Sequence, residues 1–319
     1  MEPLSNAEWS KKLNVNKSTV SKVLRHCSGV DSELREMILM QVGSVYQRQV
    51  NGCDIYCIIP DNPKWFWSEL ERGLTERIER MNYTCKLNIY SKLEDENVIL
   101  HYLEEARLLE ARVVVLTAKI TDRILAKIEE LNRTALVILL SEYESLINCP
   151  YVGSDPVQEG RQMGQAYLEH YGQRRLIVID DGLHGNCERR IQGFMTQLSM
   201  DKREQAITIC LQKNIYQNYK LLPAKLAAKL ACYIKDNNAY CLYLPFGIHD
   251  VRLILQKAGM LSNCVCLCHD SAIFSVQGMR ICQDLYQQGI AVMNMAADFM
   301  KTERYPASKY LFVPSVFRV

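Results

Sequence analysis

The sequence predicts an α/β protein in which a small all-α segment is followed by a two-lobed body of parallel sheets covered by helices. Three observations support this prediction. Residues 4–46 have the pattern of three short helices, strand-like apolar runs alternate with amphipathic helices from residue 54 onward, and the remaining length of about 265 residues suffices for two lobes. We therefore expect a helical domain at 1–46, a short polar linker at 47–53 and the body at 54–319.

The first helix is expected to begin near Asn6, because Ser5 or Asn6 can accept hydrogen bonds from the unpaired backbone N–H groups of a first turn. Trp9 and Leu13 lie one helical turn apart and are predicted to form the inward face of this helix. Asn14 then allows a tight turn into the next helix.

The second helix begins at Asn16 or Lys17 and is predicted to bury Val20, Val23 and Leu24, which recur at helical spacing. Between residues 10 and 26 the chain has five Lys or Arg residues and no acid, although its net charge is only +2. Small polar and basic side chains on an exposed helix can reach the phosphates and base edges of DNA. The residues predicted to contact double-stranded DNA are Asn16, Lys17, Ser18, Thr19, Ser21, Lys22 and Arg25. The alternative for this segment is a three-helix module that binds another protein.

The composition is that of a globular protein, with 48% apolar and 23% charged residues. No apolar run approaches the ~20 residues that span a bilayer, and the polar N-terminus lacks the apolar core of a signal peptide. We therefore expect a cytoplasmic protein without a membrane partner. The 13 cysteines include no C-x-x-C pair, which indicates reduced thiols rather than disulfides or a zinc finger.

The densest cysteine group, Cys264, Cys266 and Cys268 followed by His269, has the residue types of a metal site. Alternation in a strand would place the three sulfurs on one face, about 6–7 Å apart in succession. That spacing is too wide for neighbouring thiolates to share one tetrahedral ion. We therefore predict a buried core strand here and no metal site.

The body shows strand and helix patterns in alternation, which is typical of parallel sheets that bind ligands at the carboxyl ends of their strands. The expected strands are 54–60, 84–90, 112–116, 135–140, 175–179, 206–210, 240–244 and 264–268. The expected helices are 66–81, 95–109, 121–131, 156–171, 188–198, 218–234, 249–258 and 284–300.

Several motifs within this pattern resemble the lac repressor family of transcription regulators. The run LNVNKSTVSKVL at 13–24, followed by VDSELRE at 30–36, is similar to the helix-turn-helix DNA-binding head of that family. Further motifs resemble, in order and spacing, its periplasmic-binding-protein-like effector domain. They are VGSDPVQEG at 152–160, LEHYG at 168–172, RRIQGF at 189–194, HDS at 269–271 and CQD at 282–284.

The resemblance implies a homodimer that binds a DNA operator and responds to a small-molecule effector, commonly a sugar or a purine. It also implies that the chain crosses between the lobes three times. On that basis we expect one lobe to comprise 53–172 and 284–306, and the other to comprise 173–283 and the last strands around 310–318.

The resemblance further implies which residues contact the effector between the lobes. They are Asp155, Arg190, Asp270 and Gln283. Carboxylates accept hydrogen bonds from hydroxyls, Arg donates a planar fork, and Gln does both. Apart from the resemblance, Trp65 and Phe66 follow the first strand and can supply an aromatic wall. The alternative for each of these residues is a role in the fold without contact to an effector. Asp155 in particular is placed to cap the helix that begins at Pro156.

The chain departs from the family pattern at three places. Pro245, Phe246 and Gly247 stand where the family usually has a polar pair, which predicts a more apolar pocket wall. The linker has no proline and no room for the short helix that the family inserts into the minor groove. We therefore expect a nearly straight operator, with Val50 as the one apolar candidate for insertion. The chain also carries no heptad tail of the kind that joins dimers into tetramers, so we expect a dimer.

Two other classes of protein compete with a regulator. In an enzyme, His184 with Asp180 or Asp181 could form an acid and base pair and Cys187 could be a nucleophile. No spacing ties these residues to one reaction and no glycine-rich phosphate loop is present, so we predict no catalytic residue and no cofactor. The basic N-terminal helices and the missing signal peptide argue against the other class, a solute-binding protein. We therefore predict a DNA-binding transcription regulator whose operator affinity depends on a small molecule.

Overall fold

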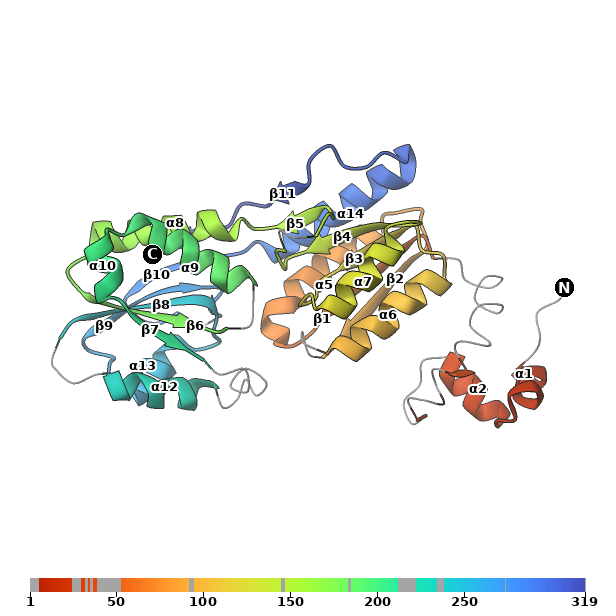
Figure 1. Cartoon of the computed structure of the whole chain (residues 1–319), viewed down its shortest axis with the longest axis horizontal. Coiled ribbons are helices and arrows are strands. Elements are labelled where there is room, and N and C mark those ends of the chain that lie inside the picture. The colour runs from red at the N-terminus through yellow and green to blue at the C-terminus, as the bar shows by residue number, and fades with distance from the viewer. Residues whose placement is uncertain are drawn as a thin grey trace.

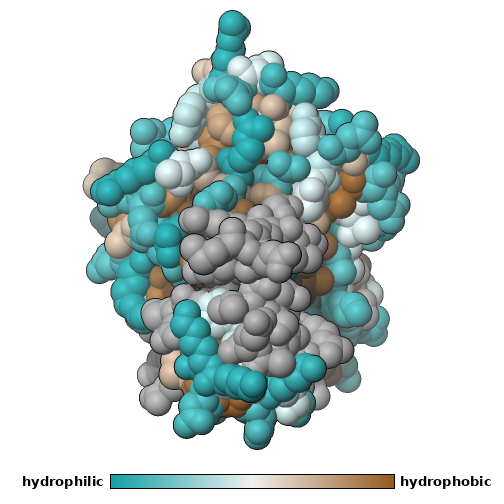
Figure 2. Space-filling view, turned by 90° about the vertical axis from the view of Figure 1, so that its right-hand side faces the viewer, coloured by the Kyte–Doolittle hydropathy of each residue, from teal (hydrophilic) through white to brown (hydrophobic). Residues whose placement is uncertain are grey.

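The structure is a computed structural model, and it describes residues 6–24, 30, 31, 34, 37, 38, 53–91, 95–144, 147–182, 185–211, 222–233, 238–272 and 274–318. In this part of the chain the strands form two six-stranded sheets, each with helices on both faces (Figure 1). No helix in the same residues is long and apolar enough to cross a membrane. Figure 2 shows that the described residues on one side of the molecule are mostly hydrophilic, with hydrophobic residues scattered among them.

Near the N-terminus, helices α1 (Asn6–Leu13) and α2 (Lys17–Leu24) are joined by a tight turn. Asn14 has a φ of 52° in this turn, a left-handed conformation that Asn adopts more readily than most residues. Trp9, Val20 and Val23 are buried together with Ile38, as the helical spacing predicts.

Of the residues predicted to contact DNA, four have exposed side chains and Thr19 is half-buried. The exposed four are Asn16, Lys17, Ser18 and Lys22. The side chain of Ser21, residue Arg25, most of the expected third helix and residues 47–52 of the linker, with Val50, lie outside the described residues.

The first sheet consists of parallel strands throughout. Its strands, in spatial order, are β11 (Tyr310–Phe312), β5 (Tyr151–Gly153), β4 (Leu136–Leu140), β3 (Val113–Leu116), β1 (Ile55–Pro60) and β2 (Cys85–Tyr90). Helices α5 (Lys64–Ile78) and α14 (Leu285–Thr302) cover one face, and α6 (Glu96–Leu108) and α7 (Asp122–Leu131) cover the other. We call this sheet with its helices the first lobe.

The second sheet is parallel except for β12, which runs antiparallel to β10. Its strands, in spatial order, are β12 (Val316–Arg318), β10 (Gly278–Cys282), β9 (Cys264–His269), β8 (Tyr240–Gly247), β6 (Arg175–Asp180) and β7 (Ile207–Cys210). Helices α8 (Pro156–Ala166) and α9 (Gly185–Gln197) cover one face, and α12 (Leu222–Tyr233) and α13 (Val251–Lys257) cover the other. We call this sheet with its helices the second lobe.

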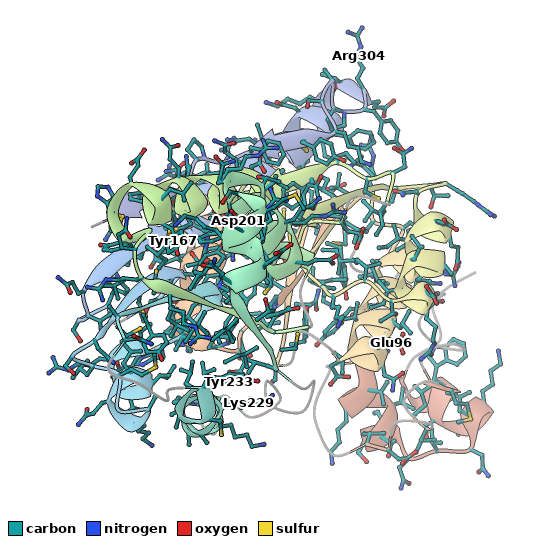
Figure 3. The ribbon with its side chains drawn as sticks, turned by 60° about the vertical axis from the view of Figure 1, so that its left-hand side comes forward. Glu96, Tyr167, Asp201, Lys229, Tyr233 and Arg304 are labelled. Atoms are coloured by element: carbon teal, nitrogen blue, oxygen red, sulfur yellow. The ribbon has the colours of Figure 1, made fainter. Side chains whose placement is uncertain are left out.

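Helix α8 continues as a π-helical turn, Tyr167–Tyr171, and a short helix α10 (Met200–Gln205) leads from α9 to β7. Figure 3 shows Lys229 and Tyr233 near one another on α12. The Lys229 ammonium group donates to the carbonyl oxygen of Cys210 at 2.8 Å, which joins this helix to the end of β7.

The expected alternation of strands and helices is present, and strand β9 is buried along its whole length, as predicted for the cysteine run. Cys264, Cys266 and Cys268 belong to the apolar core of the second lobe. The short strands β5 and β10 and helix α10 were not predicted.

Two expectations about the lobes were wrong. Helix α8 was expected in the first lobe but packs against α9 in the second, because Gly160 and Gly193 let the two helices approach until a Cβ at either position would collide with the opposing backbone. Strand β11 was expected in the second lobe but pairs with β5 in the first, where Tyr310 and Phe312 stack on one another.

Candidate functional site

A pocket of about 330 Å³ opens between the two lobes where the chain passes from β10 to α14. The first lobe contributes the beginnings of α5 and α14, and the second contributes the loop after β9 and strand β12. This volume lies at the lower end of the range for small-molecule pockets. The lining residues are Trp65, Phe66, Glu69, Asp270, Ser271, Ala272, Cys282, Gln283, Asp284, Leu285, Tyr286, Val316 and Arg318.

Four of the six residues predicted to contact an effector line this pocket. They are Trp65, Phe66, Asp270 and Gln283. The rings of Trp65 and Phe66 meet edge to face with their centroids 5.8 Å apart. The pocket therefore offers aromatic surface beside carboxylate and amide groups, a combination that suits a ligand with apolar C–H faces and several hydroxyls.

Asp270 fixes the orientation of Gln283. Its Oδ1 accepts from the Gln283 backbone N–H at 2.7 Å, and its Oδ2 accepts from Gln283 Nε2 at 2.9 Å. Gln283 Oε1 in turn accepts from Ser154 Oγ and from Gln288 Nε2, each at 3.1 Å. Asp270 has a φ of 50° at the end of β9, a left-handed conformation that Asp adopts more readily than most residues.

Arg190, on α9, stands behind the pocket and does not line it. Its side chain is only 4% exposed. Its Nε donates to Glu159 Oε2 at 2.8 Å, its Nη1 to the carbonyl oxygen of Pro245 at 2.9 Å, and its Nη2 to Asp270 Oδ2 at 3.3 Å. The resemblance to the family implied a direct contact of Arg190 with the effector, whereas here the guanidinium reaches the pocket only through Asp270.

The charges around Arg190 shift one another's pKa. Burial raises the pKa of Glu159 and outweighs the attraction of Arg190, which acts in the opposite direction. Burial alone would lower the pKa of Arg190, but the carboxylates of Glu159 and Asp270 raise it. His269 is held neutral because burial, and secondly Arg190, lower its pKa well below the usual value.

Side chains from all three crossings between the lobes meet at this cluster. Ser154 lies in the first crossing, between β5 and α8, and Gln283 lies in the second, between β10 and α14. Ser315 lies in the third, between β11 and β12, and its hydroxyl donates to Glu159 Oε1. We call the connected set the hinge network: Ser154, Glu159, Arg190, Asp270, Gln283 and Ser315.

Asp155 takes the structural role that its sequence position allowed. Its Oδ1 accepts from the Gln158 backbone N–H at 3.0 Å and so caps α8. It does not line the pocket between the lobes.

The expected apolar wall at 245–247 takes another form. β8 has an irregularity between Leu244 and Gly247. Phe246 turns into the apolar core of the second lobe, and the Pro245 carbonyl accepts from Arg190. A Cβ at Gly247 would lie 3.2 Å from the Trp65 ring. The lining of the pocket includes none of Pro245, Phe246 and Gly247, so the expectation of an apolar side-chain wall was wrong.

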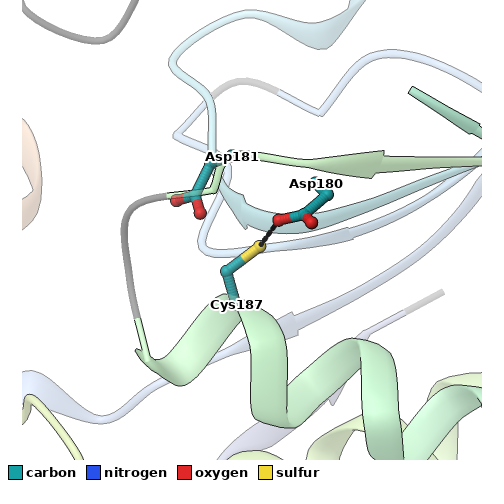
Figure 4. A group of neighbouring side chains, drawn as sticks. All are labelled: Asp180, Asp181 and Cys187. Atoms are coloured by element: carbon teal, nitrogen blue, oxygen red, sulfur yellow. Dashed lines mark hydrogen bonds between the residues drawn. The ribbon is translucent and has the colours of Figure 1, made fainter. Parts of the chain in front are cut away.

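A second cluster lies at the carboxyl end of β6, where Asp180, Asp181 and Cys187 bring possible metal ligand atoms within 4.8 Å of one another. Figure 4 shows the thiol of Cys187 directed at Asp180, with Sγ 3.9 Å from Oδ1. Burial, and then the nearby carboxylates, raise the pKa of Cys187 well above the usual value, so the sulfur remains a thiol. A thiol is a poor nucleophile, which weakens the enzyme alternative. His184 lies outside the described residues.

Sequence reasoning missed three members of the hinge network. Ser154 and Glu159 stood inside a motif of the family resemblance, and the signal for Glu159 was an acid directly before Gly160 on a helix face that must be buried. Nothing in the sequence around Ser315 distinguishes it from a surface serine.

Comparison with models of protein families gave no match, and comparison with curated proteins gave none. Solved structures are similar to most of the chain. A sugar transporter from Clostridium phytofermentans has a TM-score of 0.67 at 16% identity, over 83% of this chain and 98% of that one. A periplasmic solute-binding protein of an ABC transporter from Actinobacillus succinogenes 130z, with D-allose bound, has a TM-score of 0.66 at 12% identity, over 83% and 96%.

A protein described as a LacI transcriptional regulator, from Bacteroides fragilis, has a TM-score of 0.64 at 13% identity, over 84% of this chain and 97% of that one. These similarities establish the fold: the chain has the two-lobed α/β architecture of periplasmic-binding-protein-like proteins. The structures named here are transport, solute-binding and regulatory proteins rather than enzymes.

Proposed function

We propose that this protein is a cytoplasmic, homodimeric transcription regulator of the lac repressor type. In this proposal α1 and α2 contact double-stranded DNA, and a small-molecule effector, a sugar or a related polyhydroxy compound, binds between the lobes. The observation that carries it is the pocket lined by Trp65, Phe66, Asp270 and Gln283 in a chain that also has a basic helix pair at its N-terminus.

The pocket chemistry supports a sugar-like effector. Trp65 and Phe66 offer ring faces or edges for the C–H groups of a sugar, while Gln283 and Asp270 are already oriented by hydrogen bonds. Oriented polar groups lower the entropy cost of binding. Glu69 and Asp284 add acceptors at the wall of the pocket.

The helix α2 supports the DNA role through its exposed side chains. Lys17 and Lys22 are exposed, Ser18 lies beside Lys17, and the opposite face of the helix is buried through Val20 and Val23. A helix held by one apolar face and carrying lysines on the other can enter a major groove and neutralise phosphates.

Control would work through linkage. An effector that prefers one arrangement of the lobes shifts the population of that arrangement, and operator affinity changes by the difference in the effector's affinity for the two states. The hinge network joins Asp270 and Gln283, which line the pocket, to all three crossings between the lobes. An effector that contacts Asp270 or Gln283 in the pocket therefore changes the hydrogen bonds of the hinge network, which includes a residue from each crossing.

The second candidate is a solute-binding protein without DNA binding. It is favoured by the similarity to a sugar transporter and to an allose-bound periplasmic protein. Such a protein would bind a sugar in the same pocket, so a ligand assay alone does not separate the candidates.

DNA titration separates them. The full chain should bind a random duplex at low salt, with affinity that falls steeply between two salt concentrations. Replacing both Lys17 and Lys22 with Ala should weaken this binding at least about tenfold, whereas the charge-matched pair Lys257→Ala and Lys301→Ala on exposed body sites should not. Unchanged DNA binding in the first double variant, or no DNA binding by the parent chain, would favour the second candidate. Mass spectrometry of a small molecule that copurifies with the chain would identify the effector.

A further inference from the structure

Asn186 lies on α9 of the second lobe, but its side chain bonds the backbone of the first lobe. Its Oδ1 accepts from the backbone N–H of Tyr143 at 3.0 Å, and its Nδ2 donates to the carbonyl oxygen of Ser141 at 2.8 Å. Asn186 is only 6% exposed. One buried amide therefore joins the two lobes through both of its polar groups.

The loop that receives Asn186 is fixed to the first lobe. Ser141 follows β4 with a φ of 64°, and its backbone N–H donates to the carbonyl oxygen of Val152 at 2.8 Å. The Tyr143 ring meets the buried ring of Tyr151 edge to face at 5.2 Å and stacks on Tyr310 at 5.7 Å. Because this loop is held in its own lobe, separating the lobes must break the Asn186 bonds rather than drag the loop along.

A second bridge between the lobes lies beside the pocket. Trp65 of the first lobe meets the ring of His249 in the second lobe edge to face, with centroids 5.7 Å apart. A Cβ at Gly247 would lie 3.2 Å from the Trp65 ring. This bridge is an apolar contact, whereas the Asn186 bridge is made of oriented hydrogen bonds.

We propose that Asn186 is the latch that holds the lobes closed when no effector is bound. The amide is suited to this role because it donates and accepts at once, which Asp, Ser or an apolar residue of similar size does not do in the same geometry. Opening the lobes exposes the amide and its two backbone partners to water, so the latch sets the ratio of closed to open molecules without preventing opening.

The proposal depends on the two-lobed fold and not on DNA binding or on the identity of an effector. Its test uses the full chain alone. Amide hydrogen exchange followed by mass spectrometry reports on the Tyr143 N–H, which is protected only while Asn186 accepts from it. Small-angle X-ray scattering on the same samples reports the overall spread of the lobes.

In the ligand-free wild type, the Tyr143 amide should be protected. Asn186→Ala removes both bonds, so exchange at Tyr143 should become about tenfold faster and the radius of gyration should rise. Asn186→Asp keeps the acceptor but loses the donor and should give a smaller increase. The matched control is Gln192→Ala, an exposed residue of the same helix, which should leave both readouts unchanged.

Two results would overturn the latch. The first is that the Tyr143 amide of the wild type exchanges at the rate of an unprotected amide. This measurement requires no variant. The other is protection at Tyr143 in Asn186→Ala equal to that of the wild type. If Asn186→Ala also loses protection in β4 and β6, it has unfolded, and the comparison of Asn186→Asp with the wild type decides the matter.

Discussion

Arg190 donates from Nη2 to the same Asp270 oxygen, Oδ2, that accepts from the side chain of Gln283. A guanidinium with no place on the pocket wall thereby contacts a pocket carboxylate that also orients Gln283. Glu159 shares the guanidinium from the other side, through Nε at 2.8 Å. Arg190 thus balances two carboxylates, one of them buried in the second lobe and one at the pocket.

Replacing Arg190 with Ala should therefore destabilise the fold. The change would leave Glu159 and Asp270 as buried carboxylates without their counter-charge, and removing one partner of a buried ion pair costs about 3–5 kcal/mol. Urea denaturation of the body should show this decrease in the free energy of unfolding. Arg189→Ala, at the next position of the same helix, should change it by less than about 1 kcal/mol. Equal stability of the Arg190 variant and the parent chain would mean that solvent enters the cluster.

His269 should make stability depend on pH. Its pKa is depressed in the folded state, so the unfolded chain takes up a proton below about pH 6.5 while the folded chain does not. The contribution of His269 is present above that pH and is lost as the pH falls toward the folded pKa, by about 1.4 kcal/mol per unit. The raised pKa of Glu159 gives the free energy of unfolding the opposite dependence on pH above about pH 4.5. The test therefore compares variants that differ only in a histidine.

The comparison uses urea denaturation at pH 7.5, 6.5 and 5.5. The free energy of unfolding should fall with acidification more steeply in the wild type than in His269→Gln. His170→Gln, which changes an exposed histidine, should keep the wild-type slope. Identical slopes for the wild type and His269→Gln would show that His269 is protonated in the folded protein.

Trp65 should contribute directly to effector affinity. Trp65→Ala removes the largest aromatic surface of the pocket and also its contact with His249, so the affinity for the copurified ligand should fall at least about tenfold, or about 1.4 kcal/mol. Titration calorimetry measures this change. Tyr305→Ala removes an aromatic residue that is 61% exposed and outside the pocket lining, and should leave affinity unchanged. A full-affinity Trp65 variant would place the ligand elsewhere.

Lys22 should contact a base of the operator and not only the phosphate backbone. Lys22→Ala should weaken binding to the natural operator by roughly 1–3 kcal/mol more than binding to random DNA, because a base contact is lost only on the operator. Fluorescence anisotropy on both duplexes measures the two losses. Equal losses would identify Lys22 as a phosphate contact, and Lys257→Ala should cause neither loss.

The strands of the body were predictable where burial was complete. β1, β3, β4, β8 and β9 are apolar over most of their length because both faces of a parallel strand are covered, and such runs stand out from polar surroundings. β5 escaped prediction because it has only three residues, and β10 escaped because its buried residues alternate with half-buried ones and form no continuous apolar run. The placement of α8 in the second lobe depended on the close approach of α8 and α9 at Gly160 and Gly193, which brings together residues far apart in sequence.

Part of the pocket was also predictable from the sequence. Trp65 was predicted from its position after the first strand, because strand ends of parallel sheets gather at one edge, whereas Asp270 and Gln283 were predicted from the family resemblance. Asp155 also follows a strand, but its carboxylate caps α8 instead. Asn186 gave no signal, because its partners are backbone groups of another lobe and backbone groups have no sequence identity.

The last two strands, β11 and β12, end different sheets although three residues separate them. Each lobe consequently receives an edge strand from the same short segment, residues 310–318. During synthesis β5 and β10 remain edge strands of their sheets until residues 310–318 have emerged from the ribosome. The two lobes are therefore completed by one segment, and a deletion of these nine residues would remove an edge strand from both sheets.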